Sequence, residues 1–130
     1  MLKKLVFMAL VASALTGGRV FAGDLDGTQW KIRKKGVTGI LMFWRTDTLK
    51  FENSQFTSVD CLPYGFKTSA YNSTKEGDKV AWSAMQANDK GEKMDWKGTA
   101  SINMMEGTYV WTKSKGMART YAWKGCRKTK

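Results

Sequence analysis

Apolar and polar residues alternate with a period of two through most of the chain after residue 23. The segment 93–102 shows this most clearly, because its alternate positions are charged or hydroxyl-bearing. Read as a helix, the segment would spread its charges around the whole axis, so the period of two predicts a strand. The residues that share its apolar face are Met94, Trp96, Gly98, Ala100 and Ile102.

An apolar residue two positions before a tryptophan recurs four times, at Trp82, Trp96, Trp111 and Trp123. Each interval has room for one strand and one turn. Glycine-containing segments at 75–78, 88–91, 104–107 and 114–116 are the expected turns, because glycine adopts the positive φ that tight hairpins need. Turns this short predict antiparallel neighbours, since parallel crossovers need a dozen or more residues.

Further strands are predicted upstream at 28–33, 48–52, 56–59 and 66–73, which brings the total to about eight. Even spacing and short turns predict an all-β fold, a single antiparallel up-and-down barrel, with a meandering β-sandwich as the alternative. Closure would leave no free sheet edge, so we expect a monomer. The apolar stretch within Gly36–Trp44 does not alternate, and it is either the start of a buried strand or a flap over the barrel mouth.

The first 22 residues have the three parts of a secretory signal peptide. Lys3 and Lys4 precede an apolar run from Leu5 to Leu15, and Val20 and Ala22 occupy the −3 and −1 positions of a cut before Gly23. The run is about half the length of a membrane-spanning helix. We therefore expect a signal peptide at 1–22, a barrel domain at 23–130, and a secreted or periplasmic protein with no transmembrane segment.

Composition removes several kinds of chemistry. The chain has no histidine, which excludes Ser-His-Asp hydrolysis and histidine-bound zinc. Its carboxylates fall mainly in predicted turns such as Glu76 and Asp78, which do not provide the fixed pair that glycoside hydrolysis needs. We expect a non-enzymatic protein without a metal or cofactor.

The two cysteines, Cys61 and Cys126, would form a disulfide in an oxidising compartment. Closing such a long loop would stabilise the fold by about 4 kcal/mol in the chain-entropy model. The alternative is two free thiols, because the residues end strands that are neither neighbours nor parallel in the predicted order.

The segment Leu25–Trp30, with Gly27 shortly before Trp30, resembles the start of lipocalin-like, calycin-type barrels. The chain also looks like small secreted bacterial proteins of unknown function. The patterns that carry this second likeness are Asp47-Thr48-Leu49-x-Phe51, Phe56-x-Ser58-x-x-Cys61 and Trp82-x-Ala84-x-Gln86. The lipocalin resemblance implies that a tryptophan plugs the closed end and that a small apolar or amphipathic ligand binds inside the barrel.

The aromatic face has two interpretations: it fills the barrel, or it lines a cup for one small ligand. In the second, basic residues beside the aromatic face would form a collar for an anionic head group. The expected ligand-binding residues are Trp82, Trp96, Tyr109, Trp111, Tyr121, Trp123, Lys113, Arg119 and Gln86.

The chain has 22 basic and 11 acidic residues, and some of them gather at the two ends of the predicted barrel, with Asp89 and Glu92 as the acidic residues near the mouth. Basic residues near the mouth are Arg33, Lys34, Lys35, Lys67, Lys90, Lys113, Lys115 and Arg119. Acidic residues near the opposite end are Glu52, Glu76, Asp78 and Glu106. Nucleic acid is not expected as a partner, because the aromatics and lysines such as Lys31, Lys50, Lys93, Lys97 and Lys124 lie on opposite faces. If the interior is packed, the alternative function is docking on an anionic envelope component or a protein.

Overall fold

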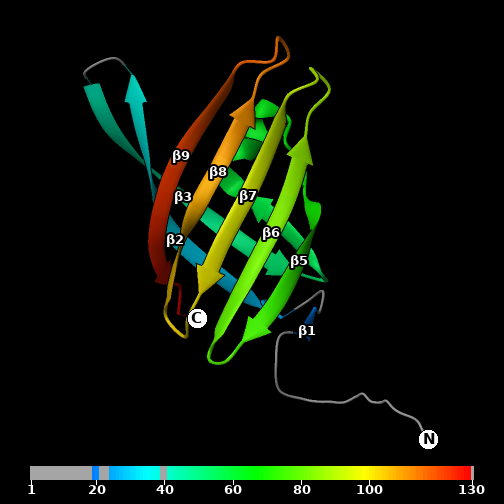
Figure 1. Ribbon diagram of the computed structural model, residues 1–130, viewed down its shortest axis with the longest axis vertical. Coiled ribbons are helices and arrows are strands. Elements are labelled where there is room, and N and C mark those ends of the chain that lie inside the picture. The colour runs from blue at the N-terminus through cyan, green and yellow to red at the C-terminus, as the bar shows by residue number, and fades with distance from the viewer. Residues whose placement is uncertain (1–18, 21–23, 39–40, 130) are drawn as a thin grey trace, which may run out of the picture.

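The computed structural model describes residues 19–20, 24–38 and 41–129. Nine strands and one 3₁₀ helix follow one another along this part of the chain (Figure 1). They are β1 (Arg19–Val20), β2 (Thr28–Thr38), β3 (Leu41–Glu52), β4 (Gln55–Ser58), η1 (Val59–Tyr64), β5 (Ser69–Glu76), β6 (Lys79–Ala87), β7 (Lys93–Ala100), β8 (Met104–Thr112) and β9 (Ala118–Arg127).

Strands β2 to β9 form a closed antiparallel barrel of eight strands. Sequential neighbours pair along the chain, and β2 also pairs with β9, which closes the sheet. The short β1 lies outside the barrel order and pairs with β5 through Arg19–Lys75 and Val20–Thr74. The predicted all-β up-and-down barrel is confirmed, and the sandwich alternative is not formed.

The predicted signal peptide lies almost entirely outside the described residues. Of residues 1–22, only Arg19 and Val20 are described, as β1. The closed barrel is built from Thr28 onward, within the segment assigned to the domain at 23–130.

Burial follows the predicted alternation along β7. Met94, Trp96 and Ala100 are buried, whereas Lys93 and Lys97 are exposed. The five lysines expected on the outer face, Lys31, Lys50, Lys93, Lys97 and Lys124, are all exposed.

Two details at the end of β7 differ from the prediction. Ile102 is 75% exposed, because β7 ends at Ala100 and Ile102 lies in the following turn. That turn closes where Ser101 N–H donates to the carbonyl of Met104 at 2.8 Å. The expected turn at 104–107 is therefore wrong: these residues begin β8.

Glycines under aromatic rings mark where the sheet coils. Gly98 and Gly107 are paired across β7 and β8. A Cβ on Gly98 would lie 2.6 Å from Trp82 Nε1 and 2.7 Å from a ring carbon of Trp123. A Cβ on Gly125 would lie 2.0 Å from the carbonyl oxygen of Lys31. The absence of a side chain lets rings or backbone approach this closely.

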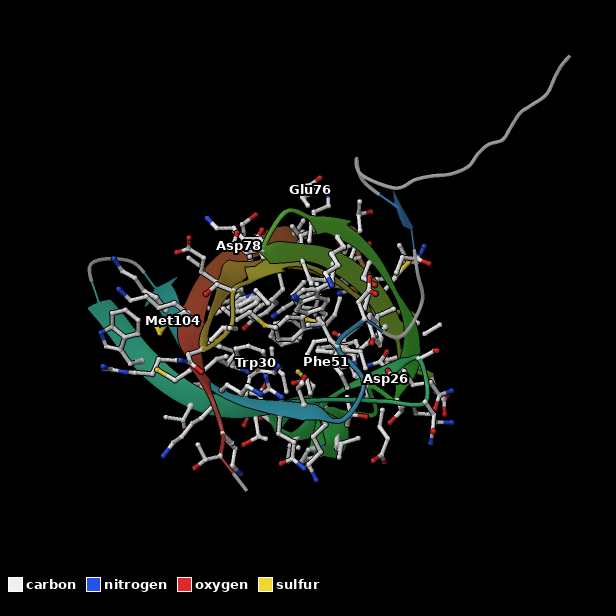
Figure 2. All side chains as sticks on the ribbon, turned by 90° about the horizontal axis from the view of Figure 1, so that it is seen from below. Asp26, Trp30, Phe51, Glu76, Asp78 and Met104 are labelled. Atoms are coloured by element: carbon white, nitrogen blue, oxygen red, sulfur yellow. The ribbon has the colours of Figure 1, made fainter. Side chains whose placement is uncertain are left out.

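The two ends of the barrel differ in character. Figure 2 shows the lower end, with Trp30 and Phe51 inside the barrel and Asp26, Glu76 and Asp78 around it. Trp30 is 1% exposed, and its indole N–H donates to Thr28 Oγ1 at 2.8 Å. At the upper end, η1 and the loops after β6 and β8 come together, and the β2–β3 hairpin extends past the barrel (Figure 1).

That extension includes the segment Gly36–Trp44. The segment belongs to the long β2–β3 hairpin, whose strands pair from Thr28–Phe51 to Thr38–Leu41. Of the two alternatives, strand β3 does start within the segment, at Leu41, and a flap over the mouth is not formed, because the hairpin leaves the barrel wall (Figure 1). Trp44 is 45% exposed, and the guanidinium of Arg33 lies 4.7 Å from the centre of its ring.

Candidate ligand-binding surface

Aromatic side chains fill the barrel interior. Trp96 and Tyr109 stack with ring centres 4.6 Å apart, and Tyr109 and Tyr121 stack at 4.8 Å. Trp82 and Trp123 lie 5.9 Å apart across the interior. A ligand-sized internal cavity would leave accessible surface on these rings, yet Trp82, Trp96, Trp123 and Tyr109 are only 3, 1, 3 and 5% exposed. These four side chains therefore fit the first interpretation, in which the aromatic face fills the barrel.

Gln86 is a structural link in that core. Its side chain is fully buried, its Oε1 accepts the indole N–H of Trp96 at 3.0 Å, and its Nε2 donates to the carbonyl of Lys67 at 3.0 Å. Both ends of the amide are thus paired inside the protein. A ligand would have to displace one of these bonds to reach it.

A buried ionic network at the upper end was missed by the sequence analysis. Lys34 Nζ lies 3.4 Å from a carboxylate oxygen of Asp47 and 2.7 Å from one of Asp60. Asp47 also accepts the hydroxyl of Ser58 and the backbone N–H of Asp60. The expectation that Lys34 lies at the solvated rim is wrong, because it is 4% exposed. The signal was present: Lys34 continues the inward alternation of Trp30 and Ile32.

The collar residues of the β8–β9 hairpin are less buried than the core. Trp111, Tyr121 and Lys113 are half-buried, and Arg119 is exposed. Lys113 Nζ lies 4.8 Å from the centre of the Trp111 ring. Arg119 is the register partner of Trp111, so the predicted basic and aromatic residues do share one end of this hairpin.

An open depression of about 890 Å³ lies on the outer surface of the barrel. Its lining positions alternate with buried ones: Ala81 and Ser83 flank buried Trp82, and Ala122 and Lys124 flank buried Trp123. The lining therefore belongs to the outer face of β5–β9, part of which faces the viewer in Figure 1. It is completed by Lys35 and Trp44 of the β2–β3 hairpin.

The depression has a low floor of small residues and a cationic rim. Gly98, Gly107, Ala81 and Ala122 contribute little or no side chain to the floor. Hydroxyl and amide side chains also line the depression, and they are those of Asn72, Thr74, Ser83, Thr99 and Thr108. The positive charges around it come from Lys35, Lys97 and Lys124, whereas its carboxylate is that of Glu106.

Trp82 and Trp123 also line this depression, from behind the glycines. Their indole N–H groups, like that of Trp111, have no hydrogen-bond partner among the described residues. A buried donor without a partner costs about 1–3 kcal/mol. The alternation predicts both tryptophans in an internal cup and Lys35 near its mouth, but Trp44, Lys97 and Lys124 have no sequence signal that marks them as part of a site.

The predicted Cys61–Cys126 disulfide is wrong, because both thiols are free. Cys61 is buried in η1, whereas Cys126 is exposed near the end of β9, where its Sγ lies 3.6 Å from Met104 Sδ. Burial raises the pKa of the Cys61 thiol, and a hydrogen bond with Ser58 opposes that rise only in part. Cys61 is thus protonated and unreactive at neutral pH.

Burial also dominates the ionisation of two core tyrosines. It raises the pKa of Tyr109, and it raises that of Tyr71, where a hydrogen bond from the phenol to Asp26 adds to the effect. The Tyr71 hydroxyl donates to Asp26 at 2.8 Å and accepts the backbone N–H of Leu25 at 2.9 Å. Both phenols therefore stay neutral when an exposed tyrosine would ionise.

No protein-family model matches the chain, and no curated protein or solved structure matches it. Within the described part of the chain, helices with the length and apolar character of a membrane span are absent.

Proposed function

We propose that this chain is a secreted or periplasmic, non-enzymatic binding protein for a small anionic amphipathic ligand, which it holds on the outside of the barrel. The site is the 890 Å³ depression over β5–β9. The observation that carries the proposal is the combination of an apolar floor at Gly98 and Ala122 with a rim of Lys35, Lys97 and Lys124.

The floor and the rim suit the two parts of such a ligand. An alkyl or aromatic tail gains about 25 cal/mol per Å² of apolar surface removed from water, which the glycine and alanine floor can provide. An anionic head gains charge-assisted hydrogen bonds from the lysines. The exposed ring of Trp44 adds an apolar wall beside Lys35.

The packed interior supports an outer site over an internal one. An apolar molecule entering the barrel would have to displace Trp96 or Tyr109 from the stacked column. The outer depression needs no such displacement. The proposed site is therefore on the outer face of β6–β9, whereas the alternating aromatic residues predicted a site on the inner face of the same strands.

The carboxylates support a binding role over hydrolysis. The buried Asp47 and the partly exposed Asp60 are both engaged by Lys34, and Asp60 also pairs with Arg45. The lining of the depression contains one carboxylate, that of Glu106, and acid–base hydrolysis of glycosides uses two.

Calorimetric titration with dodecanoate, and with dodecanol as its uncharged analogue, tests the proposal. The double variant Lys97→Gln/Lys124→Gln should bind dodecanoate about tenfold or more weakly, because two charge-assisted bonds are lost. Its affinity for dodecanol should change less than twofold. The matched control Lys50→Gln/Lys93→Gln removes two exposed lysines outside the depression and should bind both ligands as the parent does. Equal losses for both ligands, or no binding by the parent protein, would contradict the proposal.

The second candidate function is docking on an anionic envelope surface, and it is favoured by the openness of the same cationic face. Lys97 and Lys124 are exposed, so a larger anionic surface can reach them without entering a cavity. Vesicles of phosphatidylglycerol separate the two functions. Vesicle binding without dodecanoate binding would select docking, and the reverse result would select the small ligand.

A further inference from the structure

Strands β2 and β9 separate before either of them ends. Their pairing runs from Trp30–Arg127 to Lys35–Ala122 and stops there. Strand β9 nevertheless continues to Ala118, still paired with β8, and β2 continues to Thr38, still paired with β3. Figure 1 shows the consequence, because the β2–β3 hairpin diverges from β9 at the upper end of the barrel.

The divergence leaves backbone hydrogen-bonding groups on two facing edges. Over Ala118–Tyr121, β9 has a strand neighbour on its β8 side, and the described residues place none on its other side. Over Gly36–Thr38, β2 pairs with β3 on one side, and no described strand pairs with its other side. Unpaired strand edges are templates for an additional strand.

There is space at this edge for an extended chain. A cleft of about 430 Å³ lies beside β9 and is lined by Lys35, Arg119, Thr120, Tyr121 and Ala122. The free stretch of β9 is four residues long, which corresponds to about 13 Å at the usual rise of a strand. An added strand of four to six residues would match it.

The side chains at the edge indicate what that strand carries. Alternate residues of β9 point to the same face, so Arg119 and Tyr121 belong to one face and Thr120 to the other. Among the described residues, the lining contains two cationic side chains, Lys35 and Arg119, and no carboxylate. The Tyr121 ring is fixed on one side by its stacking on Tyr109 and offers apolar surface to a neighbour.

We propose that the β9 edge at Ala118–Tyr121 is a docking site for an extended acidic peptide of a partner protein, which adds to the sheet as a further strand. Backbone hydrogen bonds would provide the affinity. Specificity would come from an Asp or Glu beside Arg119 and an apolar residue two positions away beside Tyr121. This site goes beyond the amphiphile depression, which it adjoins at Lys35 and Ala122, and its own residues are Arg119, Thr120 and Tyr121.

A second copy of this chain is a poorer occupant than an acidic peptide. The cationic residues beside the free stretch of β9 are Lys35 and Arg119. Edge-to-edge pairing of two copies would bring these like charges together, which destabilises a sheet. A peptide with acidic residues at alternate positions would instead be attracted to these cationic side chains.

The test uses a fluorescently labelled, end-capped octapeptide in which Glu and Val alternate, with binding followed by fluorescence anisotropy. The parent protein should bind it saturably, and a Lys/Val peptide of the same length should not bind. Arg119→Gln should weaken binding about tenfold through the loss of one charge-assisted contact. The control Lys50→Gln, also exposed but distant from this edge, should leave it unchanged.

Two further measurements distinguish strand addition from simple charge attraction. Bound peptide should slow amide hydrogen exchange at those residues of Ala118–Tyr121 whose N–H groups point away from β8, because these N–H groups become paired. Two peptides can be made, one N-methylated at its odd-numbered residues and the other at its even-numbered residues. One of them should not bind, because methylation removes the N–H donors that face β9. If both methylated peptides bind as the parent peptide does, or exchange at β9 is unaffected, strand addition is wrong.

The outcome is independent of the proposed function. Lys97→Gln/Lys124→Gln should keep peptide affinity while losing dodecanoate affinity, and Arg119→Gln should do the opposite. Peptide binding that depends on Lys97 and Lys124 would overturn the β9 site and leave the amphiphile site intact. Concentration-dependent dimerisation in sedimentation that the peptide does not inhibit would instead identify a second copy as the occupant, which also overturns it.

Discussion

The inner and outer faces of β6–β9 are built by the same strands, yet they differ in almost every physical property. Trp96 on the inner face is 1% exposed, stacked on Tyr109 and hydrogen-bonded to Gln86. Lys97, one residue further along, is exposed and lines an open depression. The comparison separates what stabilises the barrel from what is available to a ligand.

Small residues have different effects on the two faces. Inward, the missing side chains of Gly98 and Gly107 make room for the rings of Trp82 and Trp123. Outward, Ala81 and Ala122 are the small side chains, and lysines lie around them. The packing inside and the depression outside therefore depend on different positions of the same strands.

The largest expected effect is on the inner face. Trp96→Ala should lower the free energy of unfolding by about 3–5 kcal/mol, because it removes a large buried ring. Lys97→Ala should lower it by less than about 0.5 kcal/mol, since its side chain is exposed. Urea denaturation of both variants measures the two values. Equal losses would contradict the assignment of faces.

The buried ionic network gives a second contrast, between Lys34 and its neighbour. Lys34→Met should cost about 3–5 kcal/mol, because it leaves the buried carboxylate of Asp47 without its cation, whereas the partly exposed Asp60 keeps Arg45. Lys35→Met, one residue along on the outer surface, should cost less than about 0.5 kcal/mol. Thermal and urea unfolding of both variants would check this, and a small effect at Lys34 would mean that the pair is not buried in solution.

The glycine pair gives a third, smaller effect. Gly98→Ala should destabilise the protein by about 1–3 kcal/mol, since its Cβ would overlap Trp82 and Trp123. Thr99→Ala, the adjacent outward position, should stay within about 0.5 kcal/mol of the parent. If Gly98→Ala unfolds at the same urea concentration as the parent, the rings do not lie against this glycine.

Alkaline pH should reveal the buried tyrosines. Because the folded pKa of Tyr109 is raised, its contribution to stability is fully present below the ordinary tyrosine pKa of about 10 and is lost as pH rises further. Above that pH it should make the free energy of unfolding fall by about 1.4 kcal/mol per pH unit. In Tyr109→Phe the slope should be smaller by that amount between pH 10 and 11.5. An unchanged slope would show that Tyr109 is not shielded.

The alternation of side chains made the barrel predictable from sequence. Trp82, Trp96 and Trp123 alternate with polar residues, and that period alone fixes which face they occupy. The same rule applied strictly would have placed Lys34 and Asp47 inside, since they continue the alternation of Ile32 and Leu49. Their charge argued for solvent, and only the geometry shows that they satisfy each other.

Other features depend on contacts that no local pattern specifies. The separation of β2 from β9 beyond Lys35 depends on where non-sequential strands stop pairing. The outer depression depends on the coil of the sheet at Gly98 and Gly107. The disulfide was inferred from compartment chemistry, but η1 buries Cys61 away from Cys126 at the surface.

The packed interior and the outer position of the ligand can be tested together by mapping bound dodecanoate with NMR. The account predicts shifts at the backbone amides of Thr99, Thr108 and Ala122 on the outer face. It also predicts no shift of the Trp96 indole N–H, which stays bonded to Gln86 inside the barrel. Shifts confined to that indole and to the Gln86 side-chain amide would place the ligand in the interior and contradict the account.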